Sequence, residues 1–225
     1  MKLGKEIVRR LMREFKIDED EFVSLKASRS GNPFEVLVTT IISQNTSDKN
    51  TALAIRRLKS EVKNIKPEEI SKIPLGELEE ILRPAGLYRQ KARVIKEVAS
   101  ILSDGRLDSI LSLPTLEEIR NALMKLPGVG PKTADVVISM TTEKRTIAID
   151  RHIARVVRRL GIAESGGYEE IRSRLMEIFE PEDYLKAHLL LIKLGRTYCR
   201  ARNPRCEDCP LKDLCRFSEA TSSPA

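Results

Sequence analysis

The sequence predicts an all-α protein. Apolar residues recur at the spacing of an α-helix along almost the whole chain. The single run that could form a strand, residues 146–149, is too short and too isolated to build a sheet, which excludes a parallel-sheet enzyme. Residues that typically cap helices stand where the apolar pattern begins or ends. Together these three observations define the fold class.

The expected helices follow one another with short connections and no low-complexity linker, so we expect two lobes that pack together. Asn32 and Thr115 precede two of the helical patterns as N-caps, and Gly161 follows another as a C-cap. The clearest patterns cover residues 33–42, 95–102, 116–126, 153–160 and 171–179.

The charge balance favours a polyanionic partner. Forty Lys and Arg residues against thirty-three Asp and Glu give a net charge of +7, which indicates nucleic acid before any acidic small molecule. No apolar stretch approaches the ~20 residues that cross a bilayer, and the first residues lack the apolar core of a signal peptide. We therefore expect an intracellular monomer, cytoplasmic or nucleoid-associated, with no membrane partner. A charged fraction of 32% is also typical of thermophilic proteins.

All four cysteines lie near the C-terminal end in a C-x6-C-x2-C-x5-C array, which favours one local metal site over disulfides. A zinc site usually has two close pairs of ligands, whereas this array has one CxxC, so the pattern favours an iron–sulfur cluster. Zinc and unligated structural cysteines remain as alternatives. Arginines in the loop between the first two cysteines either face solvent or contact phosphate. The cysteines are Cys199, Cys206, Cys209 and Cys215, and the arginines are Arg200, Arg202 and Arg205.

The segment 126–135, LPGVGPKTAD, predicts a hairpin between two helices. Gly128 and Gly130 permit positive φ and let the backbone of Gly128, Val129 and Gly130 approach a ligand. Free amides at the start of the second helix would then bind a phosphate. An ordinary helix connection would need one glycine as a C-cap. Two glycines followed by proline and lysine therefore favour binding of a DNA backbone.

Two residues near helix starts are candidates for chemistry. Lys132 lies in the first turn of the second hairpin helix, where the macrodipole should lower its pKa, so it is either a nucleophile or a phosphate-binding cation. Asp150 precedes the helix at residues 153–160 and is predicted to be its N-cap. An ionised carboxylate there could also stabilise positive charge on a sugar.

The hairpin LPGVGPKTAD, the segment IDRH at residues 149–152 and the cysteine array together resemble the endonuclease III branch of the helix-hairpin-helix DNA glycosylases. This resemblance covers the chain from about Asn32 to Cys215. It implies a two-lobe helix-hairpin-helix DNA glycosylase fold that holds DNA and a [4Fe-4S] cluster. The implied six-helix domain spans residues 25–143, and the cluster domain spans residues 1–24 and 144–216. The small polar end of the chain, residues 217–225, is expected to be a disordered tail.

The resemblance also assigns roles. Lys132 is expected to attack the sugar with help from Asp150, and the loop carrying Arg202 and Arg205 is expected to touch DNA. Leu87 matches the leucine that wedges into the duplex, although it could equally be a core residue.

Gln44 and Asn45 match the loop that fills the gap left by the extruded base, and the sequence leaves open which of the two does so. The basic residues that follow Leu87 are expected to lie mainly on a solvated helix face. They are Arg89, Lys91, Arg93 and Lys96.

These features predict a bifunctional DNA glycosylase and abasic-site lyase that acts on double-stranded DNA containing damaged bases or abasic sites. Oxidised pyrimidines are the expected substrates because a ring-saturated base stacks poorly and is easily extruded. One alternative is a mismatch glycosylase that removes thymine or uracil opposite guanine, although such relatives generally lack a lysine at the position of Lys132. The other is a non-catalytic DNA-binding module.

Overall fold

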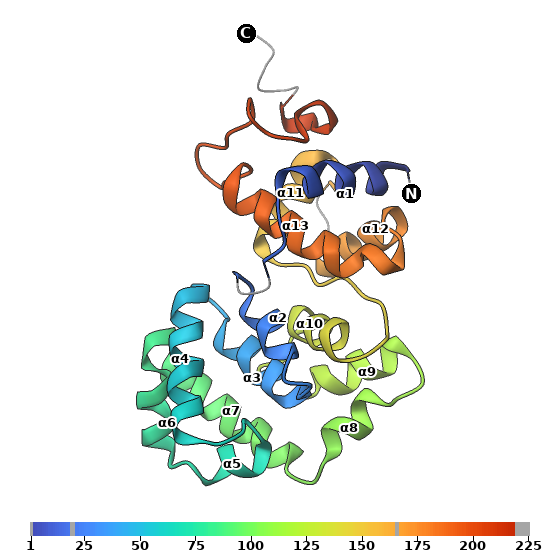
Figure 1. Ribbon diagram of the computed structural model, residues 1–225. Helices are drawn as coiled ribbons and strands as arrows, with labels where there is room; N and C mark the ends of the chain where they lie inside the picture. Colours follow the sequence, from blue (N-terminus) through green and yellow to red (C-terminus); the bar gives the residue numbers. More distant parts are fainter. Residues whose placement is uncertain (1, 19–20, 165–166, 219–225) are drawn as a thin grey trace. The chain divides into compact units, whose positions relative to one another are not determined.

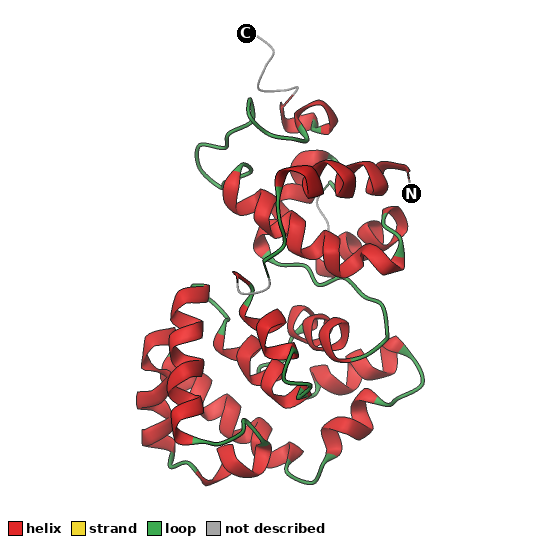
Figure 2. Ribbon diagram, viewed as in Figure 1, coloured by secondary structure: helices red, strands yellow, loops and turns green. Residues whose placement is uncertain are grey.

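The computed structural model describes residues 2–18, 21–164 and 167–218, and every regular element in this part of the chain is a helix (Figures 1 and 2). The predicted all-α class is therefore confirmed. Residues 147–149 are buried but form no strand. The chain divides into two compact units, one made of residues 18–144 and the other of residues 1–17 and 145–225.

The unit of residues 18–144 is built around the helix α3 (Pro33–Ile42), which packs against α2, α4, α7 and α10. Residues 34–42 are all buried, so α3 is enclosed on every side, with Glu35, Thr39 and Thr40 as its buried polar residues. The Asn32 side chain accepts hydrogen bonds from the amides of Phe34 and Glu35, as its predicted capping role requires. The other elements of this unit are α2 (Val23–Ser28), α4 (Asp48–Glu61), α5 (Pro67–Lys72), α6 (Leu75–Leu82), η2 (Arg83–Ala85), α7 (Tyr88–Leu102), α8 (Arg106–Leu111), α9 (Leu116–Met124) and α10 (Pro131–Thr141).

In the second unit, α13 (Tyr184–Thr197) packs against α1 (Lys2–Glu14) and α11 (Arg151–Leu160). Gly195 allows the close approach of α11 and α13, because a Cβ atom at this position would lie 2.8 Å from the Cβ of His152. Gly161 ends α11 with a φ of 78°, which confirms the predicted C-cap. The elements of this unit are α1 (Lys2–Glu14), α11 (Arg151–Leu160), α12 (Tyr168–Ile178), η3 (Pro181–Asp183), α13 (Tyr184–Thr197) and η4 (Lys212–Leu214).

The division between the units falls at residue 18, whereas the sequence predicted residue 25, because α2 packs on α3. At the other end, Phe217 lies under the guanidinium of Arg159, at 4.5 Å from its ring centroid, so this residue of the expected tail is packed. Residues 219–225 lie outside the described part of the chain. Among the described residues, no helix is both long enough and apolar enough to cross a membrane.

Candidate functional site

The hairpin predicted from residues 126–135 joins α9 to α10. Gly128 has a φ of 70°, and a Cβ atom on it would lie 2.6 Å from Cγ1 of Val94, so only glycine fits there. The Val129 side chain is 5% exposed and its amide donates to the carbonyl of Leu126 at 3.2 Å. Val129 therefore stabilises the turn itself, and its side chain is not available to a ligand.

Gly130 does not use the positive φ that glycine permits. Its φ of −93° and ψ of −179° are extended values that any residue adopts. A Cβ atom on Gly130 would meet no other atom of the described chain within 4 Å. The conformation of the chain therefore does not require glycine at this N-cap of α10. Its absence of a side chain instead leaves the start of the helix open to an approaching group.

Lys132 follows Pro131 in the first turn of α10 and is half-buried. The position of this turn depends on a buried ion pair between the two hairpin helices. Arg120 of α9 donates from Nε to Oδ1 of Asp135 at 2.9 Å and from Nη2 to Oδ2 at 3.3 Å. The Arg120 side chain is 4% exposed and that of Asp135 is fully buried. This bidentate pair fixes α10 against α9, and it therefore also fixes the backbone position of Lys132.

Asp150 is the N-cap of α11, as the sequence predicts, and its Oδ1 accepts from the Ile153 amide at 2.8 Å. This bond uses one carboxylate oxygen and fixes the side chain at the positive end of the helix dipole. Asp150 belongs to the unit that carries the cysteines, whereas Lys132 belongs to the hairpin unit.

Gln44 and Asn45 have different environments. The Gln44 side chain is half-buried, and its Nε2 donates to the Gly128 carbonyl at 3.1 Å and to Oγ1 of Thr133 at 3.3 Å. Asn45 is exposed and has a left-handed φ of 53°. The structure therefore brings Gln44 to the hairpin and leaves the Asn45 side chain at the surface.

Leu87 is 57% exposed and occupies a left-handed conformation, with φ 48°, at the start of α7. The alternative that Leu87 belongs to the core is therefore wrong. A large apolar side chain held in the open by a rare backbone conformation is what insertion into a base stack requires.

Sequence reasoning missed the environment of Lys91. We expected it on a solvated helix face, but it is 4% exposed. Its Nζ donates to the carbonyls of Ile42 at 2.7 Å and Ala85 at 2.9 Å. Burial lowers the pKa of Lys91 to about 8, while the two carbonyl oxygens favour the ammonium form. No short-range pattern signals this burial, because lysine at this position also suits a helix surface.

The four cysteines line one hollow near η4, together with Arg159, Tyr198 and Phe217, and all four are free thiols. Burial raises the pKa of Cys209 to about 11 and raises that of Cys206 as well, so their thiolates need nearby positive charge. Arg159 supplies part of it by donating to Sγ of Cys199 at 3.4 Å. Although no three described Cys, His, Asp or Glu side chains form a site for one metal ion, four thiols around one hollow fit a larger iron–sulfur group.

The arginines in the loop between Cys199 and Cys206 differ in whether they already have a partner within the protein. Arg205 pairs with Asp208 at 2.8 Å and lies over the ring of Tyr198. Arg202 is exposed and makes no hydrogen bond or ion pair within the described chain. Arg202 is therefore the side chain of this loop that is best placed to bind a phosphate.

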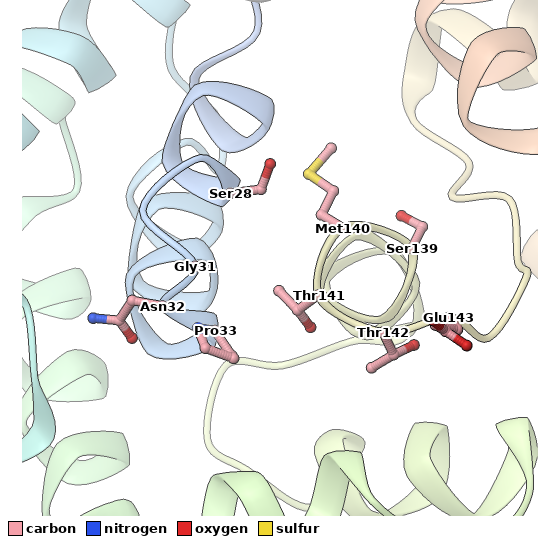
Figure 3. Close-up of a pocket in the computed structure, with 9 residues that line it drawn as sticks. All are labelled: Ser28, Gly31, Asn32, Pro33, Ser139, Met140, Thr141, Thr142 and Glu143. Carbon is pink, nitrogen blue, oxygen red and sulfur yellow. The ribbon is translucent and has the colours of Figure 1, made fainter.

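A hollow of about 300 Å³ lies beside the start of α3 and the end of α10, and Figure 3 shows the side chains that line it. Lys132 lies at the other end of α10, and none of the predicted site residues lines this hollow. It is therefore separate from the hairpin. The lining residues are Ser28, Gly31, Asn32, Pro33, Ser139, Met140, Thr141, Thr142 and Glu143.

Comparison with known proteins supports the same interpretation. Residues 38–181 match the HhH-GPD superfamily base excision DNA repair protein family, and residues 199–215 match the iron-sulfur binding domain of endonuclease III. The chain is 36% identical to the endonuclease III of Sulfolobus acidocaldarius, over 96% of this chain and 97% of that protein. It is 34% identical to the endonuclease III of Thermotoga maritima, over 96% and 91% of the two chains.

Two solved structures agree with these matches. A trapped covalent intermediate of an endonuclease III with DNA aligns with a TM-score of 0.73 at 36% identity, covering 85% of this chain and 87% of that one. A thermostable thymine-DNA glycosylase shares the fold, with a TM-score of 0.77 at 21% identity over 97% and 95% of the chains. The chain belongs to the endonuclease III family of helix-hairpin-helix base excision repair enzymes, which are DNA glycosylases and abasic-site lyases with an iron–sulfur cluster.

Proposed function

We propose that this protein excises oxidised pyrimidines from double-stranded DNA and cleaves the strand at the resulting abasic site, with Lys132 as nucleophile and Asp150 as stabilising carboxylate. The proposal rests on the geometry at the start of α10. Lys132 lies in the first turn of a helix whose N-cap, Gly130, has no side chain and needs none for its own conformation. A phosphate that approaches this helix start would place the adjacent sugar near the lysine.

The chemistry begins when the Lys132 amine attacks C1′ of the extruded nucleotide. The C1′–N bond breaks, the base leaves with the bonding electrons, and it takes up a proton. The nitrogen lone pair then forms the C1′=N bond of a protonated Schiff base as the C1′–O4′ bond breaks, and O4′ takes up a proton to become a hydroxyl of the opened sugar. Loss of a proton from C2′ expels the 3′ phosphate by β-elimination, and water finally hydrolyses the Schiff base and restores the amine.

Asp150 has two tasks in this scheme. Its Oδ1 is used by the Ile153 amide, which leaves Oδ2 to face developing positive charge at C1′. The same carboxylate can accept the proton that Lys132 must lose before it attacks. The N-cap bond fixes the position of the carboxylate, so the structural and chemical roles support each other.

The four cysteines would hold the iron–sulfur cluster. When bound, it supplies a rigid anchor for the loop between Cys199 and Cys206, and this anchor restricts the positions that Arg202 can occupy. Arg202 then contributes a phosphate contact that positions the duplex without reading its sequence. We infer that the protein works where genomic DNA is, in association with the nucleoid.

Oxidised pyrimidines are the proposed substrates because a ring-saturated base is poorly stacked and because an amine nucleophile needs little activation of the leaving base. We expect thymine glycol to be excised at least about tenfold faster than thymine opposite guanine, a barrier difference of about 1.4 kcal/mol. Comparable rates would favour a mismatch glycosylase.

The test combines duplexes carrying thymine glycol, a G·T mismatch or an abasic site with borohydride trapping. Lys132→Gln should abolish the trapped adduct and strand cleavage while DNA binding remains. Asp150→Asn should slow base removal strongly with a small loss of affinity, because the amide still caps α11. A Lys132→Gln variant that traps at the wild-type rate would show that another amine is the nucleophile. Wild-type protein that binds all three duplexes but cleaves none would indicate a non-catalytic DNA-binding module.

A further inference from the structure

Lys91 is a buried cation without a carboxylate partner. No ion pair of the described residues includes it, and its two acceptors are both backbone carbonyls. Desolvation of an ammonium is unfavourable, and an apolar side chain would fill the same space without that penalty. A lysine at this position therefore needs an explanation that packing does not supply.

The two carbonyls explain the choice of a cation. Ile42 is the last residue of α3 and Ala85 is the last residue of η2, so both oxygens are at helix C-termini where carbonyls lack intrahelical donors. The negative end of each helix attracts an ammonium group. One Nζ atom thus connects two helix ends that are 43 residues apart in the sequence.

Each of these helix ends lies shortly before an exposed side chain, Asn45 or Leu87, and these two side chains are called the probes below. Ile42 is three residues before Asn45, and Ala85 is two residues before Leu87. Asn45 and Leu87 are both exposed and both have left-handed backbones, with φ values of 53° and 48°. Within the described residues 18–144, they are the only non-glycine residues with positive φ.

We infer that Lys91 is a positioning residue that fixes the spacing between Asn45 and Leu87, so that both side chains enter the duplex together. The inference rests on the proposed function, and it takes the exposed Asn45 as the side chain that fills the gap and Leu87 as the one that wedges into the stack. Gln44 continues the connection, because it joins the Asn45 loop to the hairpin through Gly128 and Thr133. Hydrogen bonds thus link the Leu87 turn, the Asn45 loop and the hairpin that carries Lys132.

The chain offers a matched control on the same helix. Lys96 also lies on α7, and its Nζ also donates to two carbonyls, those of Ser71 at 2.7 Å and Ile73 at 2.5 Å. These acceptors belong to the end of α5 and its C-cap, away from both probes in the sequence. Lys96→Met therefore removes the same kind of contact without releasing either probe.

The experiment uses the full chain with its cluster. The duplex contains a tetrahydrofuran abasic analogue opposite 2-aminopurine, whose fluorescence rises when the probes disturb its stacking. Lys91→Met should show little of the fluorescence increase that wild type shows. Its single-turnover excision of thymine glycol should be about tenfold slower, which corresponds to an activation free energy about 1.4 kcal/mol higher. Lys96→Met should behave like wild type, and affinity for undamaged duplex should remain close to wild type in both variants.

A double-mutant comparison separates positioning from general stability. In an Asn45→Ala, Leu87→Ala background, Lys91→Met should cause little further loss of rate, because the side chains that it positions are already gone. An effect of the same size in both backgrounds would overturn the inference, as would equal behaviour of Lys91→Met and Lys96→Met. If Lys91→Met loses helicity, Lys91→Gln keeps a shorter N–H donor and takes its place under the same criteria. Absence of excision by wild-type protein would instead count against the proposed function.

Discussion

Removal of one partner of the Arg120–Asp135 pair should destabilise the hairpin unit. Asp135→Leu leaves the Arg120 guanidinium, which is 4% exposed, paired at 2.9 Å with the carboxylate of Glu117, whose side chain is 57% exposed. A broken buried pair typically costs about 3–5 kcal/mol, and Glu117 should bring this change to the lower end. Arg120→Met should cost a similar amount because it removes the guanidinium from a fully buried carboxylate.

The double variant distinguishes pairing from packing. Arg120→Met with Asp135→Leu replaces both charges by apolar groups, so it should be more stable than either single variant, with a coupling of at least about 2 kcal/mol. Urea titrations followed by circular dichroism at 222 nm measure these differences, and an unchanged m-value shows that the same surface is exposed. This prediction would be refuted if each single variant lost less than about 1 kcal/mol of unfolding free energy and the two losses added in the double variant.

Three further predictions concern the hairpin, the arginine loop and the metal. Gly130→Val should weaken binding to damaged and undamaged duplexes without lowering the melting temperature, whereas Gly128→Ala should destabilise the protein by at least about 1 kcal/mol because of its positive φ. Equal decreases in melting temperature for Gly130→Val and Gly128→Ala would contradict this prediction. Arg202→Ala should reduce by about one the slope of the logarithm of the DNA binding constant against the logarithm of the salt concentration. Arg205→Ala should reduce this slope less, because the Arg205 side chain is already paired with Asp208. The reverse order would show that Arg205 makes the phosphate contact. Purified protein should be brown with about four iron atoms per chain, and Cys209→Ser should lose the colour; one zinc per chain after anaerobic purification would overturn this.

Local signals in the sequence predicted much of the fold and part of the site. The spacing of apolar residues located the main helices, and Asn32, Thr115 and Asp150 all cap the helices that they precede. The glycines and the proline located the turn between α9 and α10. Each of these features depends on residues within a few positions of one another, which is the range over which patterns carry information.

Contacts between distant segments could not be predicted in the same way. Lys91 reaches a carbonyl 49 residues away, and Gln44 reaches one 84 residues away. Their side chains suit a surface helix or loop equally well, so only the packing of α3, α7 and the hairpin shows that they are connectors. The two hairpin glycines differ, because both permit positive φ but only Gly128 adopts it, while Gly130 leaves the backbone open.

The division of the chain between the two units has a consequence for how the protein is made on the ribosome. Residues 18–144 are contiguous, so this unit can fold as soon as it emerges, whereas α1 is synthesised first and its partners α12 and α13 come after that whole unit. Until then the apolar face of α1, with Ile7, Val8 and Leu11, has no site to bury it. The cysteines emerge later still, and iron can be captured only after the last of them. Cluster insertion can therefore follow the folding of residues 18–144, and slow iron supply should accumulate chains in which this unit is folded and the other is not.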